Sequence, residues 1–281
     1  MKTLVAHISV DLDAVSSSWL VRRYMPGWRD AEMKFVSAGT TLNGMKPDED
    51  SDIIHVDTGM GQFDHHQLND PEKHFSATRR VFDYLKGCGH LRQNDVPPLE
   101  LMVNHITSID HFGELYFPEP QNIRYNFGLD QLFDGFKANR MEDQEAVDIG
   151  FKCLDAVFVI VRQKIHADEE IKKGYIFETK WGKAIAMETK NEEAVKQALK
   201  SGFKLVIRRN PDYGHIRIKS WPITDIDLTP VHDKIIKKDP KATWYLHSSK
   251  NMLLNGSNKR PDSVASSLGL PQVIEIIKSI S

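Results

Sequence analysis

Short apolar runs that end in polar loops recur through the first 60 residues. They read TLVAHISV from Thr3, KFVSA from Lys34 and DIIHVDTG from Asp52. Runs of this length, bounded by turn residues, are typical of buried β-strands.

Helical spacing occurs between and after these runs. Val15, Trp19, Leu20 and Tyr24 would share one face of a helix, and the block SATRRVFDYLKG has the same periodicity, with Gly87 placed as a C-terminal cap. Strands that alternate with helices predict an α/β domain with a mainly parallel sheet flanked by helices, which we place over residues 1–125. In such sheets, ligands bind beyond the carboxyl ends of the strands.

The pattern of apolar and polar residues changes after residue 125. Residues 126–173 favour helix and keep one apolar face, which predicts a helical connector. Residues 174–281 alternate strand-like and helix-like segments again, which predicts a smaller, mixed α/β domain. The length of 281 residues suits two domains.

Composition narrows the class of partner. With 37 Lys and Arg against 39 Asp and Glu, the net charge of -2 gives no general attraction to nucleic acid or anionic membrane. Cys88 and Cys153 have neither pairing nor metal-site spacing, which favours a reducing compartment. No apolar run reaches the ~20 residues of a membrane span, and the N-terminal stretch turns acidic before a signal-peptide core could form. We therefore expect a soluble, cytoplasmic protein without membrane contact. A homodimer is possible.

Metal-capable side chains gather at or near the predicted strand ends. They are His7, Asp11, Asp13, Asp57, the triplet Asp64-His65-His66, and Asp110. Carboxylate oxygens mixed with imidazole nitrogens suit Mn²⁺, Fe²⁺ or Zn²⁺ better than Ca²⁺. Two such ions about 3.5–4 Å apart, joined by a bridging carboxylate, serve hydrolysis.

The order and spacing of these residues resemble the motifs of the DHH phosphoesterase superfamily. The segment HISVDLDAVSS is similar to the family's first motif, and the aspartate of DIIHVDTG to its second. FDHHQ is similar to the third motif, and the aspartate of SIDHFGE to the fourth. The resemblance covers about residues 3–115, and the family includes RecJ-like nucleases, oligonucleotidases and family II pyrophosphatases.

The resemblance implies two divalent ions, with Mn²⁺ preferred and Fe²⁺, Co²⁺, Zn²⁺ or Mg²⁺ as alternatives. One ion would be held by His7, Asp11 and Asp57. The other would be held by the bridging Asp57 together with Asp13, His65 and Asp110. His66 would face the scissile phosphate, and a water shared by the ions would attack it, so Asp57 and His66 are the residues expected to act in catalysis. Asp64 would orient a histidine without binding metal itself.

Taken singly, each of these residues has a simpler interpretation. An aspartate after a strand commonly caps a helix, a lone histidine can be a hydrogen-bonded core residue, and a DHH triplet can be a surface loop. His74, His105 and His111 flank the motifs and could support the metal ligands, but surface or capping roles are simpler for them. The metal interpretation depends on all four motifs occurring together and in order.

The resemblance implies that the C-terminal domain, residues 174–281, binds substrate. This domain lacks the GGGH-like stretch that a common subgroup of the superfamily carries. In its region stand RRNPDYGHIRIKS and LHSSKNMLLNGSNKRP, in which a Gly-containing loop and basic side chains could bind phosphate. The candidate substrate contacts are Arg208, Arg209, His215, His247, Lys250, Asn255, Gly256, Lys259 and Arg260. The alternative for this region is a plain surface turn.

The function expected from these features is metal-dependent hydrolysis of a phosphodiester in a small nucleotide or a short single-stranded oligonucleotide. Because the chain has no long basic tract, we favour such substrates over duplex DNA or long RNA. Two alternatives stay open. One is a phosphoanhydride hydrolase acting on pyrophosphate or polyphosphate, and the other is a protein that binds metal and nucleotide without catalysis.

Overall fold

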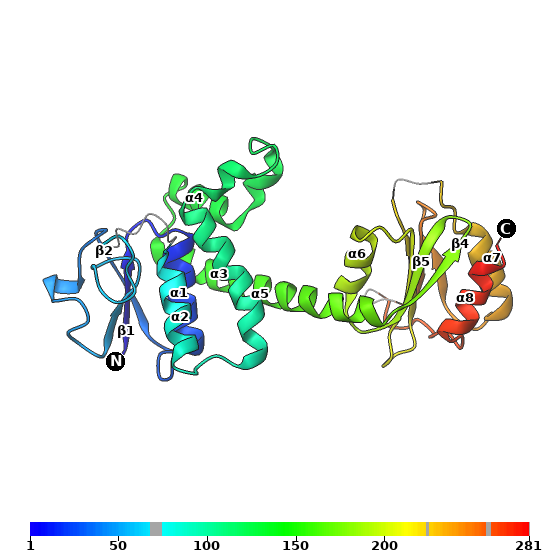
Figure 1. Ribbon diagram of the computed structural model, residues 1–281, viewed down its shortest axis with the longest axis horizontal. Helices are drawn as coiled ribbons and strands as arrows, with labels where there is room; N and C mark the ends of the chain where they lie inside the picture. Colours follow the sequence, from blue (N-terminus) through cyan, green and yellow to red (C-terminus); the bar gives the residue numbers. More distant parts are fainter. Residues whose placement is uncertain (68–74, 223–224, 257–259, 281) are drawn as a thin grey trace. The chain divides into compact units, whose positions relative to one another are not determined.

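The computed structural model describes residues 1–67, 75–222, 225–256 and 260–280. The chain forms two compact units, Met1–Arg162 and Gln163–Ser281. The boundary between them falls inside the long helix α5 (Asp143–Lys173), so this helix contributes residues to both (Figure 1).

A three-stranded parallel sheet forms the centre of the first unit, with the strand order β2-β1-β3. Its strands are β1 (Thr3–His7), β2 (Glu32–Val36) and β3 (Ile53–His55). In the central strand Leu4, Val5 and Ala6 have no exposed surface. An uninterrupted apolar run of this kind is typical of a parallel strand that is covered on both faces.

Helices cover this sheet and build the core of the first unit. They are α1 (Leu12–Tyr24), α2 (Ala77–Gly87), α3 (Val96–Asp110) and α4 (Leu129–Ala138), with the short 3-10 helices η1 (Leu42–Gly44), η2 (Gln93–Asp95), η3 (Gly113–Tyr116) and η4 (Ile123–Phe127). Helices α1 and α2 lie side by side next to the sheet (Figure 1). The same core includes Phe133 of α4 together with Leu154 and Phe158 of α5, so α4 and the first part of α5 belong to the first unit.

The second unit contains a six-stranded mixed sheet with the order β4-β5-β6-β7-β9-β8. Its strands are β4 (Tyr175–Thr179), β5 (Gly182–Glu188), β6 (Leu205–Arg209), β7 (Ile216–Ser220), β8 (Trp244–Leu246) and β9 (Met252–Asn255). Among these strands β5 and β6 form the parallel pair, and the other pairs are antiparallel.

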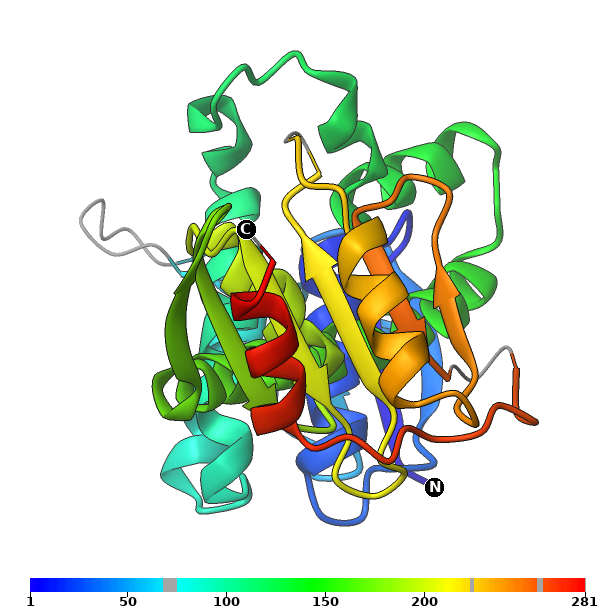
Figure 2. The ribbon, with the colours of Figure 1, turned by 90° about the vertical axis from the view of Figure 1, so that its right-hand side faces the viewer.

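Both faces of this second sheet are covered by helices. Helix α6 (Glu192–Lys200) lies on one face, whereas α7 (Thr229–Lys238) and α8 (Leu270–Lys278) lie on the other (Figures 1 and 2). The alternation of side chains along β5 explains the two layers. Ala184 and Ala186 join the core under α7 and α8, whereas Ile185 and Met187 join the core under α6.

The observed fold confirms the predicted class, an α/β protein with a parallel sheet followed by a smaller mixed α/β part. Some predicted boundaries were wrong. The first strand ends at His7 and not at Val10, because Ser9 has a left-handed backbone (φ 58°). Gly87 is the last residue of α2, and the cap is Cys88. Among the described residues, none of the helices has the length and apolar composition that crossing a bilayer requires.

Candidate metal centre

Asp11 links the fold of the first unit to the metal-capable cluster. It is the N-cap of α1, since its Oδ1 accepts a hydrogen bond from the Ala14 N–H at 3.0 Å. Its Oδ2 lies 3.6 Å from Nε2 of His7, the last residue of β1. The capping role expected of a lone aspartate and a place in the cluster are therefore compatible in one side chain.

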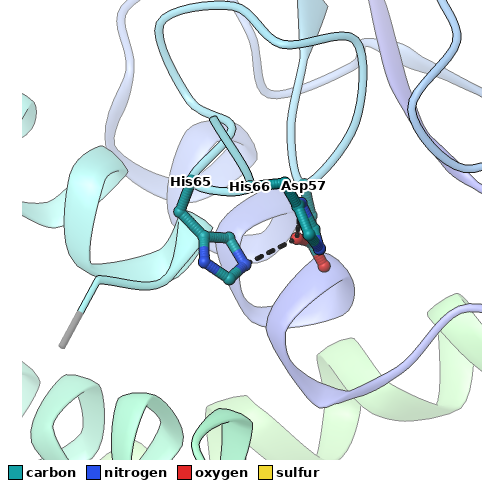
Figure 3. Close-up of side chains that lie close together, drawn as sticks. All are labelled: Asp57, His65 and His66. Atoms are coloured by element: carbon teal, nitrogen blue, oxygen red, sulfur yellow. Dashed lines mark ion pairs between the residues drawn. The ribbon is translucent and has the colours of Figure 1, made fainter. Parts of the chain in front are cut away.

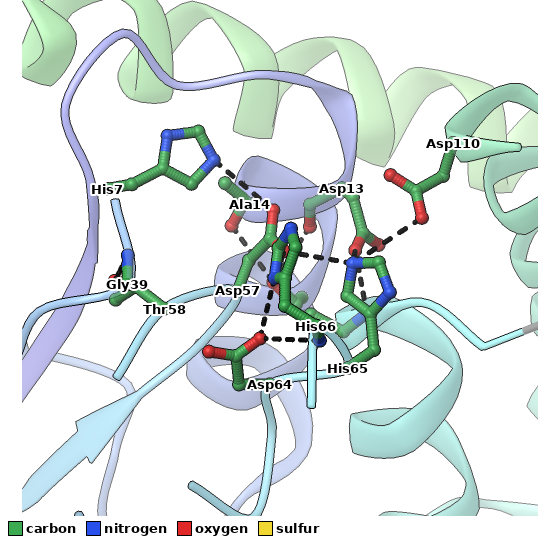
Figure 4. A network of polar contacts seen from close by, with 12 residues as sticks. His7, Asp13, Ala14, Gly39, Asp57, Thr58, Asp64, His65, His66 and Asp110 are labelled. Atoms are coloured by element: carbon green, nitrogen blue, oxygen red, sulfur yellow. Dashed lines mark hydrogen bonds and ion pairs between the residues drawn. The ribbon is translucent and has the colours of Figure 1, made fainter. Parts of the chain in front are cut away.

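Asp57 lies between two histidines just after β3. Its Oδ2 is 3.3 Å from His7 Nε2, and its Oδ1 is 3.3 Å from His65 Nε2 (Figures 3 and 4). The residue is buried and has a left-handed backbone with φ 54°. Strained backbone of this kind persists only where the surrounding structure enforces it, and it is common at functional sites. The two oxygens of Asp57 therefore face different imidazoles.

His65 is surrounded by three carboxylates. Its Nε2 lies 3.3 Å from Asp57 Oδ1, 3.5 Å from Asp110 Oδ2 and 3.8 Å from Asp13 Oδ2 (Figure 4). Ligand atoms that bind one ion at about 2.0–2.2 Å lie about 3 Å apart, so small shifts would bring these atoms to metal-binding spacing.

The N-terminus of α2 fixes Asp13. Its Oδ2 accepts a hydrogen bond from the Ala77 N–H at 2.6 Å, and its Oδ1 accepts one from the Thr78 N–H at 2.9 Å. The first N–H groups of a helix have no partner within the helix and favour a negative charge. Helix α2 therefore positions a carboxylate that belongs to the first turn of α1.

Three buried atoms of the cluster lack hydrogen-bond partners among the described residues. They are Asp57 Oδ1, His65 Nε2 and Asp110 Oδ2. Asp57 Oδ1 and Asp110 Oδ2 lie 3.3 and 3.5 Å from His65 Nε2, as ion pairs that depend on a protonated imidazole. A divalent cation among them would satisfy all three, and the mixture of carboxylate and imidazole suits Mn²⁺, Fe²⁺ or Zn²⁺. The residues therefore fit a metal ion.

The electrostatics of the cluster also favour a bound cation. Burial, together with the charges of Asp57 and Asp110, raises the pKa of Asp13 well above its usual value. Burial also raises the pKa of Asp110 to about 6, and the charge of His65 opposes this rise. Burial lowers the pKa of a histidine, but the neighbouring carboxylates outweigh this effect. Asp57, with the charges of Asp110 and Asp13, raises the pKa of His65 to about 9. Asp11 and Asp57 raise the pKa of His7 to about 11. Protonated imidazoles thus supply positive charge where a metal would supply it.

Asp64 holds His66 at the edge of the cluster. The Asp64 side chain is fully buried, and its Oδ2 accepts a hydrogen bond from the Met60 N–H at 2.7 Å. Its Oδ1 accepts bonds from the His66 N–H at 3.1 Å and from His66 Nδ1 at 2.7 Å (Figure 4). The His66 side chain is 56 % exposed, and its Nε2 makes no hydrogen bond to the described residues. The ring is therefore fixed at one nitrogen and open at the other.

Two further residues support the cluster, Asp143, which was not identified from the sequence, and His111, which was named there as a histidine that flanks the motifs. The Asp143 carboxylate accepts hydrogen bonds from the Ser9 and Val10 N–H groups, and it thereby fixes the loop between β1 and α1. His111 lies in a group with His65 and Asp110 whose ligand atoms are within 4.8 Å of one another. The surface or capping role expected for His111 was therefore incomplete. His105 stacks on Phe117, and His74 lies outside the described residues.

A cavity of about 250 Å³ adjoins the cluster. Asp11, Asp13 and Asp110 form part of its wall, and Phe112 and Lys137 lie on it as well. The Phe112 side chain is 71 % exposed, and its backbone is left-handed with φ 57°, which is unusual for a bulky residue. An exposed aromatic ring beside a metal-capable cluster is a feature that the sequence did not reveal.

Several of the candidate substrate contacts in the second unit have internal partners. Arg208 pairs with Glu192 and donates to the Thr189 carbonyl at 2.9 Å, and Arg209 pairs with Glu188. Asn255 is fully buried. Its Nδ2 donates to the carbonyls of Thr243 and Val264, and its Oδ1 accepts from the Ser266 N–H. These side chains stabilise the second unit, and the substrate contacts proposed below do not include them.

The other candidate residues in this unit lie near its loops. Lys250 Nζ is 3.2 Å from Asp227 Oδ2, and His247 Nδ1 is 2.7 Å from Ser249 Oγ. Gly256 has φ 80°, and a Cβ there would lie 2.5 Å from the His215 ring, so the position requires glycine. Arg260 is exposed, and Lys259 lies outside the described residues.

Comparison with known proteins gives limited help. No protein-family model and no curated protein matches the chain. Among solved structures, an uncharacterized protein from Helicobacter pylori has 13 % identity and a TM-score of 0.35, with 100 % of this chain and 99 % of that chain covered. RecJ in complex with Mg²⁺ from Thermus thermophilus has 12 % identity and a TM-score of 0.34, with 99 % and 49 % covered.

A third solved structure is the DHH domain of a member of a family of ribosomal proteins. It has 8 % identity and a TM-score of 0.31, with 98 % of this chain and 85 % of that chain covered. Scores at this level assign neither a family nor a function, so the functional argument rests on the residues of the cluster.

Proposed function

We propose that the protein is a divalent-metal-dependent phosphoesterase that cleaves a phosphodiester in a small nucleotide or a short single-stranded oligonucleotide. The observation that carries this proposal is the convergence of Asp57 Oδ1, His65 Nε2 and Asp110 Oδ2, three buried atoms without hydrogen-bond partners among the described residues. The four sequence motifs that supply the cluster, in the order of the DHH phosphoesterases, support it independently.

The proposed roles follow from the positions of the side chains. His7, Asp11 and Asp57 would hold one ion, since their ligand atoms lie within 4.8 Å of one another. Asp13, His65 and Asp110 would hold the second ion together with Asp57. Bound divalent ions would lower the pKa of a water and neutralise charge on the phosphoryl oxygens.

His66 would contact the substrate phosphate. Its Nδ1 is engaged by Asp64, so Nε2 is the nitrogen available to hydrogen-bond a phosphoryl oxygen. Asp64 would keep the ring in this orientation and take no metal itself. As the C-terminal sequence suggested, the second unit would bind substrate through His215, His247, Lys250, Gly256 and Arg260. We also propose that the protein acts in the cytoplasm and without a membrane partner.

The exposed ring of Phe112 favours a nucleotide over pyrophosphate. It lies on the same cavity as Asp11 and Asp13, where a nucleobase attached to the bound phosphate could stack on it. Stacking of this kind is worth about 1–3 kcal/mol per base. Pyrophosphate has no group that would use an exposed aromatic ring.

A substrate panel tests the proposal. The Mn²⁺-loaded protein would be incubated with dinucleotides, short oligonucleotides, cyclic dinucleotides and pyrophosphate, with the Asp57→Asn variant as control. We expect turnover of a nucleotide substrate that the variant lacks. Strong release of orthophosphate from pyrophosphate with inert nucleotides would replace the proposal by a phosphoanhydride hydrolase. Tight metal and nucleotide binding without any turnover would indicate a binding protein.

A further inference from the structure

The first unit contains a larger cavity that is separate from the metal-capable cluster. It measures about 990 Å³ and opens at the C-terminal end of α1. Asp13 of the cluster and Arg23 of this cavity are ten residues apart on the same helix, which places their Cα atoms about 15 Å apart. The volume lies in the range of small-molecule sites, about 300–1,000 Å³.

Positive charge from four segments of the chain converges on this basic cavity. Its cationic lining residues are Arg22, Arg23, Arg29, His90, Arg92 and Lys152. Three carboxylates, those of Asp95, Asp148 and Asp155, line it as well. With His90 neutral, five positive charges against three negative ones leave a surplus of two. A concave surface with such a surplus attracts anions.

Most of these cations lack an acidic partner. Arg23 pairs with Asp155. For Arg29, Arg92 and Lys152, the described part of the chain has no ion pair, and the side chains of all three are exposed. These three side chains are therefore free of acidic partners among the described residues and able to contact an anion in the cavity.

Aromatic rings hold two of the guanidinium groups in place. The Arg22 group lies 5.4 Å from the centre of the Phe151 ring, and its Nε donates to the Arg29 carbonyl at 3.0 Å. The Arg23 group lies 5.3 Å from the Trp19 ring centre. A guanidinium that is already ordered loses less conformational entropy when it binds a ligand. These contacts therefore favour binding at the basic cavity.

We propose that the basic cavity binds a small ligand that carries two or more linked phosphates, at a site distinct from the metal-capable cluster. Cations from four segments can contact several phosphate groups at once, and arginine forks suit phosphate oxygens. All of these cations line a single cavity, which favours a compact ligand over a strand of nucleic acid. Inorganic triphosphate and a nucleoside triphosphate share this chemistry.

Titration of the full-length protein tests the site. Inorganic triphosphate and ATP would be titrated by calorimetry in EDTA, so that no divalent ion can bind phosphate at the metal-capable cluster. We expect saturable binding of one ligand per chain. The Arg29→Glu/Arg92→Glu variant should weaken it about tenfold or more. The single variant Lys152→Glu provides a second measurement on another element of the lining.

The control is Lys46→Glu/Arg140→Glu, which changes the charge of the first unit equally at two exposed positions outside the cavity. It should change the affinity less than twofold. Equal affinity for triphosphate and ATP would mean that phosphates alone are recognised, and tighter binding of ATP would add a contact to the nucleoside; both support the site. Absence of saturable binding, equal weakening in the control, or binding of an oligonucleotide but of neither small ligand would overturn it.

Discussion

Asp64→Asn removes a buried charge beside the proposed metal centre without removing a proposed ligand. The Asp64 carboxylate is fully buried and accepts three hydrogen bonds, two from backbone N–H groups and one from His66 Nδ1. Asparagine keeps one acceptor oxygen and turns an NH₂ group toward a donor. The loss of a charged acceptor and the unpaired donor together should lower the free energy of unfolding by about 2–3 kcal/mol.

The pKa of Asp64 determines how the stability difference between wild type and Asp64→Asn changes with pH. Burial alone would raise this pKa, but the hydrogen bonds from His66 and Met60 outweigh burial and lower it. A carboxyl with a lowered pKa in the folded state adds stability above its unfolded pKa of about 4, and this stability is lost as the pH falls through the folded value. The difference between wild type and variant should therefore be full at pH 7 and shrink in acid.

Three measurements complete this test. Urea unfolding in EDTA at pH 7 and at acid pH gives the stability difference, elemental analysis after Mn²⁺ loading gives the metal content, and the substrate panel gives turnover. We expect the Asp64→Asn variant to keep both ions and to lose about 10- to 100-fold in activity, because the His66 ring is no longer fixed.

The matched control is Asp57→Asn, the same substitution at a buried position inside the cluster. It should lose metal binding, since Asp57 faces both histidines. Equal metal loss in the two variants, or unchanged stability and activity in Asp64→Asn, would refute the assigned role of Asp64.

Three further outcomes are expected. His66→Ala should retain both ions and lose about 10²-fold or more in kcat, and loss of the ions in elemental analysis would contradict its role as a substrate contact. Phe112→Ala should raise KM for a nucleotide substrate about 5- to 100-fold with little change in kcat, and an unchanged KM would show that no base stacks there. Asp239→Asn should lower the free energy of unfolding by about 1–3 kcal/mol at pH 7, because Asp239 is buried and its carboxylate accepts hydrogen bonds from Ser266 and Ser267. Burial alone raises the pKa of Asp239, but these hydrogen bonds outweigh burial and lower the pKa. Urea unfolding should therefore show that the stability difference between wild type and Asp239→Asn shrinks in acid. A stability difference that persists at low pH would contradict the role given to the Asp239 carboxylate.

The sequence predicted those parts of the molecule that depend on local pattern. The apolar run at Leu4, Val5 and Ala6 predicted a strand that is buried on both faces, and these residues are fully buried in β1. The spacing of His7 and Asp11 was informative because a strand end and the following helix cap bring the two side chains to 3.6 Å. Local chain geometry thus accounts for much of the candidate site.

Features that depend on distant segments could not be predicted. Asp143 fixes a loop more than 130 residues away in the chain, and no periodicity indicates such a contact. Asp57 and Phe112 have left-handed backbones, but neither is a glycine, so residue type did not indicate these conformations. The basic residues RR at Arg208 and Arg209 suggested phosphate binding, but the glutamates that pair with them lie on separate segments.

Diffraction from crystals loaded with Mn²⁺ tests the metal centre most directly. Anomalous scattering should show two ions about 3.5–4 Å apart on either side of Asp57, one next to His7 and Asp11 and the other next to His65 and Asp110. A single ion, or ions that do not contact Asp57, would contradict the two-metal centre proposed for this protein.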